Sequence, residues 1–237
     1  MPDGLPGSTN LRMLDVSDAF SKGSHWLVVS TVPEDAYGEE ALDRDLVQID
    51  WVGPRALAHE AVVEHFLGAG AVLPMQLFTI YTSEERALAD VRKNSRRIAR
   101  MLDRIDGHVE WGVRLTWQGH PPSKPDSGSA ASARRAVSGA SYLVKKRDLR
   151  DRNQADFKRA RTEANRLYRA VSKKATKAVR RTATEGPGSR VLLDAAFLVR
   201  ARNGKSFEAA VRREARTLEQ KGIALSLTGP WPAYNFV

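Results

Sequence analysis

Apolar residues recur at two different spacings along this chain, and the two spacings predict helices and strands in turn. In residues 82–107 they recur every three or four positions opposite Arg and Asp, which predicts an amphipathic helix ended by Gly107. In HVEWGVRLTW (108–117) they alternate with polar residues, which predicts a half-buried strand. A helix over 55–68 and an apolar strand over 71–81 precede these elements. From residue 71 to residue 117 the order is therefore strand, helix, strand.

The same order recurs near the end of the chain. VLLDAAFLV (191–199) is apolar throughout and predicts a buried strand. SFEAAVRREARTLEQKG (206–222) has helical spacing, and IALSLTG (223–229) alternates again. The two units share a layout and no clear sequence repeat. Each predicts a sheet with helices on one side, so the sequence predicts an α+β fold of two domains.

The region between the two units divides the chain. Pro, Gly, Ser and Ala dominate residues 118–141, which is typical of a flexible linker. A narrow, Ala-rich apolar stripe then predicts a long basic helix over 142–183. We therefore predict an N-terminal domain of residues 1–117, a flexible linker of residues 118–141, and a C-terminal domain of residues 142–237 that contains the long helix.

The positive charge is concentrated in one segment. The formal net charge is +10, but residues 121–190 hold 19 Lys and Arg against 6 Asp and Glu, while the rest of the chain holds 19 against 22. A basic helix over 142–183 leaves nucleic-acid binding open as an alternative function. Its charges are spread around the helix and it has few aromatic rings to stack on bases, so the sequence favours a solvated face instead.

The residues that most enzymes and metal sites need are missing or wrongly spaced. The chain has no cysteine, which excludes disulfides and thiolate metal sites. His59 and His65 are six residues apart, whereas a zincin needs a spacing of four on one helix face. We find no P-loop and no nucleophile elbow. The sequence therefore predicts no catalytic residue, cofactor or metal, although an enzyme with an unfamiliar site stays open as a third class.

Several stretches together resemble the gas vesicle GvpF/GvpL family. LPMQLFTIYTSEERALADV resembles the family segment LP-(V/L)-(R/Q)-F-G-T-(V/I)-F with its following Glu-rich helix start, and it follows a helix of the form PRALAHEAVVEHF with Trp51 just before it. VEWGVRLTW is similar to the family strand VE-(L/W)-GV-(K/R), and SGASYLVKKRDLRDR resembles the start of the family's long helix. The closing LTGPWPAYNFV resembles LTGPWPPYSFV and is the most specific match, because no ordinary turn requires Gly-Pro-Trp-Pro.

The chain departs from the family pattern in two places. Phe78 is followed directly by Thr79, without the family's glycine. No opening strand of the YLYGI kind is found, and the chain begins near the second strand, at LRMLDV or HWLVVSTV. The expected N-terminal sheet therefore lacks its first edge strand, which leaves backbone donors open to a partner strand.

The resemblance implies both a fold and a role. It implies a ferredoxin-like N-terminal domain and a C-terminal domain that joins a similar strand–helix–strand unit to the long basic helix. It also implies a non-enzymatic assembly factor or minor structural component of the gas vesicle, in the cytoplasm and at the vesicle, that binds the shell protein GvpA and other accessory Gvp proteins. No membrane contact is expected, since no apolar run is long enough for a span. The oligomeric state and the choice between a GvpF-type and a GvpL-type role are not predicted.

The residues that carry the resemblance are predicted to be structural. They are Pro74, Trp111, Gly229, Pro230, Trp231, Pro232, Tyr234 and Phe236. The prolines stiffen the aromatic tail, so the tail loses little entropy when it folds back over a sheet. We expect the tail to close the protein's own core, and the alternative is a strip that binds a partner directly.

Overall fold

The computed structural model describes residues 11–68, 70–118, 139–182 and 190–237, and its contacts divide the chain into two compact units. Unit 1 runs to His108 and includes the tail Trp231–Val237, and unit 2 is Val109–Pro230. This division differs from the predicted domains of residues 1–117 and 142–237. The predicted linker lies outside the described residues except for 118 and 139–141.

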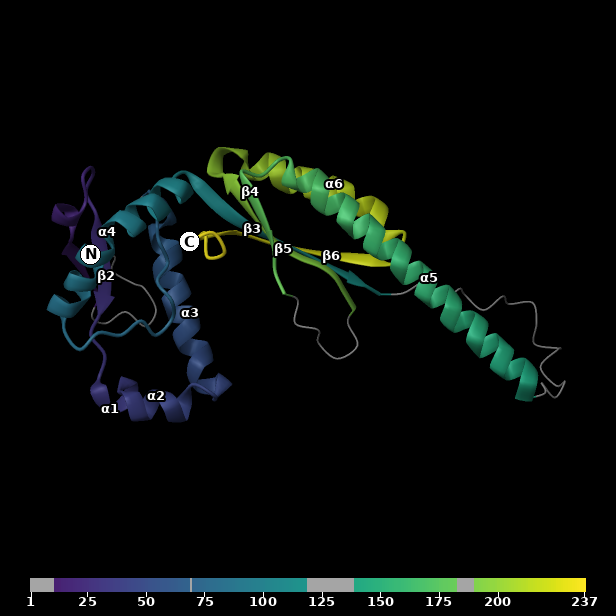
Figure 1. Ribbon diagram of the computed structural model, residues 1–237, viewed down its shortest axis with the longest axis horizontal. Coiled ribbons are helices and arrows are strands. Elements are labelled where there is room, and N and C mark those ends of the chain that lie inside the picture. Colours follow the sequence, from purple (N-terminus) through teal and green to yellow (C-terminus); the bar gives the residue numbers. More distant parts are fainter. Residues whose placement is uncertain (1–10, 69, 119–138, 183–189) are drawn as a thin grey trace. The chain divides into compact units, whose positions relative to one another are not determined.

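Unit 2 is a four-stranded sheet with two helices on one face (Figure 1). Its elements are β3 (His108–Trp117), α5 (Gly139–Ser172), β4 (Lys177–Arg180), β5 (Arg190–Arg200), the short η3 (Ala201–Asn203), α6 (Gly204–Glu219) and β6 (Ile223–Trp231). The strand order is β4-β5-β3-β6. This β-α-β-β-α-β order is that of the ferredoxin-like motif. The family resemblance implied a whole ferredoxin-like domain at the N-terminal end and only a similar strand–helix–strand unit here.

The core of unit 2 lies between the sheet and the two helices. Alternate residues of β3 and β5 face the helices, as the period of two requires. The buried residues on these strands are Trp111, Val113, Leu115, Leu193, Ala195, Phe197 and Val199. They pack in one core with four residues of α5, namely Ala160, Ala164, Leu167 and Val171. The small alanines let α5 approach the sheet closely. The predictions of strands at 108–117 and 191–199 are confirmed.

The prediction that the long helix continues to residue 183 is wrong. α5 ends at Ser172, and β4 pairs antiparallel with β5, with Ala178 opposite Phe197 and Val179 opposite Ala196. Ala175 and Ala178, three positions apart, fit a helical stripe, whereas a strand would place them on opposite faces, so their spacing alone favours a helix. Pairing with β5 forms a strand instead, because it supplies backbone hydrogen bonds such as that from the Thr176 N–H to the Leu198 carbonyl, 2.8 Å.

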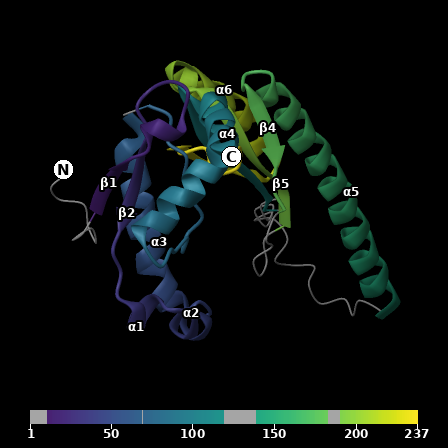
Figure 2. The same cartoon turned by 60° about the vertical axis from the view of Figure 1, so that its left-hand side comes forward.

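Unit 1 is mainly helical. It contains β1 (Leu11–Asp15), η1 (Ser17–Ala19), β2 (Trp26–Ser30), α1 (Glu34–Tyr37), α2 (Glu39–Asp45), α3 (Ile49–His65), η2 (Phe66–Gly68) and α4 (Glu84–Ile105). Figure 2 shows β1 and β2 side by side, and their register pairs Leu11 with Ser30. The ferredoxin-like N-terminal domain is not confirmed: among the described residues, LRMLDV and HWLVVSTV, the two alternatives for the family's second strand, both form strands, which pair with each other in a sheet of two.

The stretch over 71–81 was predicted to be a strand and is not one. Pro74 lacks a backbone donor, and a turn interrupts the stretch where Thr79 donates from both its N–H and its hydroxyl to the Gln76 carbonyl, at 3.0 and 2.6 Å. Phe78, inside this turn, has φ of +63°. That left-handed conformation cannot continue a strand, so the apolar run packs as an irregular segment.

Candidate partner-binding surface

Trp111 and Gly229 lie where β3 and β6 of unit 2 come close to each other. Trp111 is buried on β3, and its ring is tilted against Phe207 with centroids 6.0 Å apart. Gly229 on β6 has φ of +118°, and a Cβ there would lie 2.7 Å from the Glu110 carbonyl oxygen. Any other residue would be strained and would push the strands apart, which gives this glycine of the terminal motif a structural reason. The peptide bond from Gly229 to Pro230 is cis.

The tail after Pro230 packs as part of unit 1. Pro232 and Phe236 are buried, Trp231 is half-buried and Tyr234 is 37% exposed. The Phe236 carbonyl accepts a hydrogen bond of 3.3 Å from Nη1 of Arg104 on α4. Pro74 is also buried in this unit. These positions suit a segment that closes a core, and Tyr234 is the most exposed of the tail's three aromatic residues.

The start of α3 is fixed to α1 by one arginine. Arg55 donates from Nε to the Tyr37 hydroxyl at 3.0 Å and from Nη1 to the Trp51 carbonyl at 2.8 Å. Its guanidinium lies 3.9 Å from the Trp51 ring centroid, a cation–π distance. The Phe78 ring stacks on the same Trp51 ring, with 5.4 Å between the two ring centroids. α3 therefore begins at Ile49, before the predicted Arg55, and includes Trp51 in its first turn.

The corner between α2 and α3 is fixed by Asp45. This buried carboxylate accepts two hydrogen bonds from the Arg44 guanidinium, at 2.9 and 2.7 Å, and one from Nε2 of Gln48 at 3.0 Å. The hydrogen bonds from Arg44, together with the positive charges of Arg44 and Arg55, lower the pKa of Asp45. The two residues that follow it, Leu46 and Val47, are thus held in a defined turn.

That corner presents apolar side chains to solvent. The exposed fractions are 45% for Leu46, 86% for Val47, 76% for Ile49 and 68% for Leu57. Of the 17 residues of α3 only Val63 is classed as buried. We call Leu46, Val47, Ile49 and Leu57 the apolar corner. Large aliphatic side chains exposed at a fixed turn and on the helix that follows it are typical of a protein-binding site. Figure 2 shows α1 and α2 at the end of α3 that carries it.

The apolar corner lies in an acidic segment. Residues 33–65 contain nine Asp and Glu against two Arg, a formal net charge of −7, in a chain of net charge +10. The two arginines are those that bind Asp45 and the Tyr37–Trp51 pair. The sequence alone does not indicate this surface, because the carboxylates of EEALDRDL also fit the solvated face of an ordinary helix. The signal that could have found it is the run LVQI between those carboxylates and Asp50.

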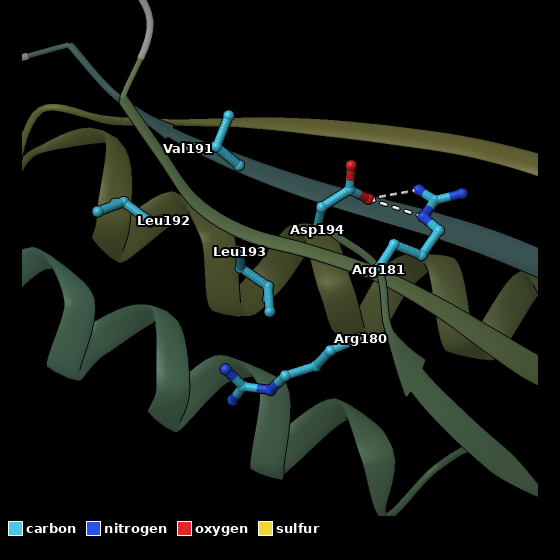
Figure 3. Close-up of a pocket in the computed structure, with 6 residues that line it drawn as sticks. All are labelled: Arg180, Arg181, Val191, Leu192, Leu193 and Asp194. Atoms are coloured by element: carbon cyan, nitrogen blue, oxygen red, sulfur yellow. Dashed lines mark hydrogen bonds and ion pairs between the residues drawn. The ribbon is translucent and has the colours of Figure 1, made fainter. Parts of the chain in front are cut away.

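Three arginines of unit 2, Arg114, Arg180 and Arg181, are engaged with groups of their own unit. Figure 3 shows Arg181 and Asp194 pointing toward each other beside a hollow of about 130 Å³. The Asp194 carboxylate, 3% exposed, accepts hydrogen bonds from Nε of Arg181 at 2.8 Å and from Arg114 at 2.6 and 3.0 Å. Arg180 points the other way, donating to Asn165 at 2.8 Å and lying over the Tyr168 ring. These side chains are therefore not arranged as a row facing a phosphate backbone.

The described ranges contain no group of three or more metal-ligating side chains. His59 and His65, the pair considered from the sequence, both lie on α3 but do not gather further ligands there. No helix in the part of the chain that the structure describes is both long and apolar enough to cross a membrane.

Comparison with known proteins decides the family. The model of the family described as "Gas vesicle synthesis protein GvpL/GvpF" matches residues 18–237. The chain belongs to the GvpL/GvpF family. It is 29% identical to gas vesicle protein L of Streptomyces sp. (strain CB03234) over 88% of this chain and 78% of that protein. It is 28% identical to gas vesicle protein L2 of Halobacterium salinarum over 81% and 74%, and 26% identical to gas vesicle protein F of the same Streptomyces over 91% and 85%.

Two solved members of the GvpL/GvpF family have the same fold. The crystal structure of GvpF from Microcystis aeruginosa matches all of this chain and 93% of that chain with a TM-score of 0.61 and 13% identity. The crystal structure of GvpF from Anabaena sp. PCC7120 matches 95% and 84% with a TM-score of 0.60 and 14% identity. The relatives include both L and F proteins, so the resemblance found in the sequence is confirmed at the level of the family.

The missing family glycine is explained by the backbone at Phe78. LPMQLFT aligns with LP-(V/L)-(R/Q)-F-G-T without a gap when Phe78 stands where the pattern has glycine, and Met75 and Leu77 then depart from the pattern as well. Phe78 is the non-glycine residue with a positive φ among those described, the conformation that glycine adopts without strain. Its ring stacks on Trp51, a contact that glycine could not make.

Proposed function

We propose that this GvpL/GvpF family member is a non-enzymatic assembly factor or minor structural component of gas vesicles. In this proposal it acts in the cytoplasm and at the vesicle, where it binds the shell protein GvpA and other Gvp proteins. The single observation that carries the binding role is the apolar corner, which exposes four large aliphatic side chains at the turn fixed by Asp45 and along the first turns of α3.

A binding role fits this corner better than a self-contained structural role. Exposing Val47 and Ile49 costs hydrophobic free energy in the isolated chain, and a partner that covers them recovers about 25 cal/mol for each Å² of apolar area. The charged side chains beside the hollow of unit 2, by contrast, are already paired with one another. The exposed apolar residues are therefore explained by a docking surface for apolar subunits, whereas the paired charges of unit 2 do not indicate a reaction site.

Co-expression with GvpA and pull-down at low and high salt tests the proposal. Capture of GvpA that persists at high salt supports it, because apolar contacts resist screening by salt. If GvpA and the other Gvp proteins are not captured at either salt concentration, the proposal is wrong. Nucleic acid that co-purifies instead, and that is lost steeply with salt, would support the alternative function of the basic helix.

A further inference from the structure

The apolar corner continues along one face of α3. At about 100° per residue, Ile49, Gly53 and Leu57 lie within about 80° of arc, and Trp51 and Arg55 lie on the opposite side of the helix. This agrees with the structure, in which Ile49 and Leu57 are exposed whereas Trp51 and Arg55 bind Tyr37 and Phe78. The exposed apolar stripe is about 12 Å long, or two turns of helix.

The stripe has a low point in its middle, at Gly53, where the helix surface carries no side chain. A Cβ placed on Gly53 would meet no atom within 4 Å, so the helix surface there is open between the side chains of Ile49 and Leu57. A glycine inside a helix costs roughly 1 kcal/mol relative to alanine. It also lets another backbone or a large side chain approach closely, which is the geometry by which an apolar helix packs against a second helix.

Exposed carboxylates surround the stripe. Asp43 precedes the corner on α2, Asp50 lies beside Ile49, and Glu64 continues the outer face of α3 toward its end. Two copies of this face placed against each other would bring these carboxylates together, so a symmetric dimer through it is opposed by charge. The face is complementary to a partner that is apolar along its centre and basic at its edges.

We propose that the apolar corner and the outer face of α3 bind an amphipathic helix of a partner protein, with aliphatic side chains over Val47, Ile49 and Leu57 and Lys or Arg beside Asp43 and Asp50. This inference deepens the proposed function, on which it rests for the identity of the partner as a gas vesicle protein. The Asp45 network holds the turn in place before binding, so little entropy is lost when the partner docks.

A pair of designed peptides tests the chemistry of the surface without GvpA. Both carry the same leucine stripe, one with lysines at its edges and one with glutamates, and fluorescence anisotropy of each labelled peptide gives its Kd for the full chain. We expect the lysine peptide to bind at least ~10-fold more tightly than the glutamate peptide at this surface. Val47→Ser with Ile49→Ser should weaken binding of the lysine peptide ~10-fold or more, and Gly53→Gln, which fills the low point, should do the same.

Matched controls keep the test specific. Val144→Ser removes another exposed aliphatic side chain, on α5, and should leave the Kd unchanged. Asp43→Asn with Asp50→Asn should weaken the lysine peptide several-fold and flatten its salt dependence, whereas Asp148→Asn with Asp151→Asn on α5 should not. The inference is overturned if the lysine peptide binds the serine and glutamine variants as tightly as the parent. It is also overturned if the chain dimerises in sedimentation and the serine variant becomes monomeric.

Failure of this inference differs from failure of the proposed function. If the serine variant captures GvpA as the parent does, this surface is wrong while the assembly role stands. If the lysine peptide behaves as expected but the parent captures no Gvp protein, the surface is supported and the identity of its partner is wrong.

Discussion

A Cβ at Gly229 would lie 2.7 Å from the carbonyl oxygen of Glu110, so the last strand and β3 meet too closely there for any other residue. The positive φ of +118° adds a second reason for glycine. We expect Gly229→Ala to lower the free energy of unfolding by about 1–3 kcal/mol. Urea denaturation measures it, with Gly68→Ala as the control, since a Cβ at Gly68 meets nothing within 4 Å. Equal stability of the two variants would contradict this account of the terminal motif.

Phe236 and Tyr234, two residues apart in the tail, test whether the tail closes the core. Phe236 is buried, whereas Tyr234 is 37% exposed. We infer that the tail closes the core of unit 1, so Phe236→Ala should cost about 3–5 kcal/mol of unfolding free energy by leaving a cavity. Tyr234→Ala should cost less than about 1 kcal/mol, as exposed substitutions usually do. Thermal melting of both variants is the measurement, and a tail that only binds partners would show no difference between them.

Asp194 is the buried carboxylate on which two arginines of unit 2 depend. Asp194→Ala leaves the guanidiniums of Arg114 and Arg181 without their partner, but these side chains are 46% and 34% exposed and water can solvate them. We therefore expect a loss of about 1–3 kcal/mol, below the cost of breaking a fully buried pair. Arg159→Ala removes an exposed ion pair and should change stability by less than about 0.5 kcal/mol. Similar urea midpoints for the two variants would refute the role of Asp194.

The α2–α3 turn should respond to acid through Asp45. Its pKa is lowered in the folded state by Arg44, so its contribution to stability is fully present above the ordinary aspartate value of about 3.9. That contribution is lost as the pH falls through the lowered pKa. The stability difference between the parent and Asp45→Asn, measured by urea denaturation, should therefore shrink in acid. The difference for Asp43→Asn, an exposed neighbour, serves as the control, and a difference for Asp45→Asn that grows in acid would contradict the assignment.

Sequence periodicity predicted the elements whose local pattern agrees with their packing. The strands at 108–117 and 191–199 alternate or are apolar throughout, and both are buried in the sheet of unit 2. Periodicity failed at residues 173–181, where alanines at helical spacing predicted a continued helix and pairing with β5 formed a strand instead. It also failed at residues 71–81, because a left-handed residue such as Phe78 cannot be recognised from hydrophobicity.

The candidate surface could not be read from the sequence for a related reason. Val47 and Ile49 look like core residues, and their exposure follows from how Arg44, Asp45 and Gln48 turn the chain between two helices. Hydrophobicity predicts burial on average and says nothing about which side of a turn faces solvent. The family match connects the chain with gas vesicles and does not indicate which surface binds a partner.

The central claim is that the chain captures the gas vesicle shell protein through the apolar corner. The most direct measurement is pull-down of co-expressed GvpA by the parent, by the variant carrying Val47→Ser and Ile49→Ser, and by the control Val144→Ser. The account predicts that the parent and the control retain GvpA at high salt and that the double variant loses it while unfolding at the same urea concentration. Capture of GvpA by the double variant at the parent's level would contradict the claim.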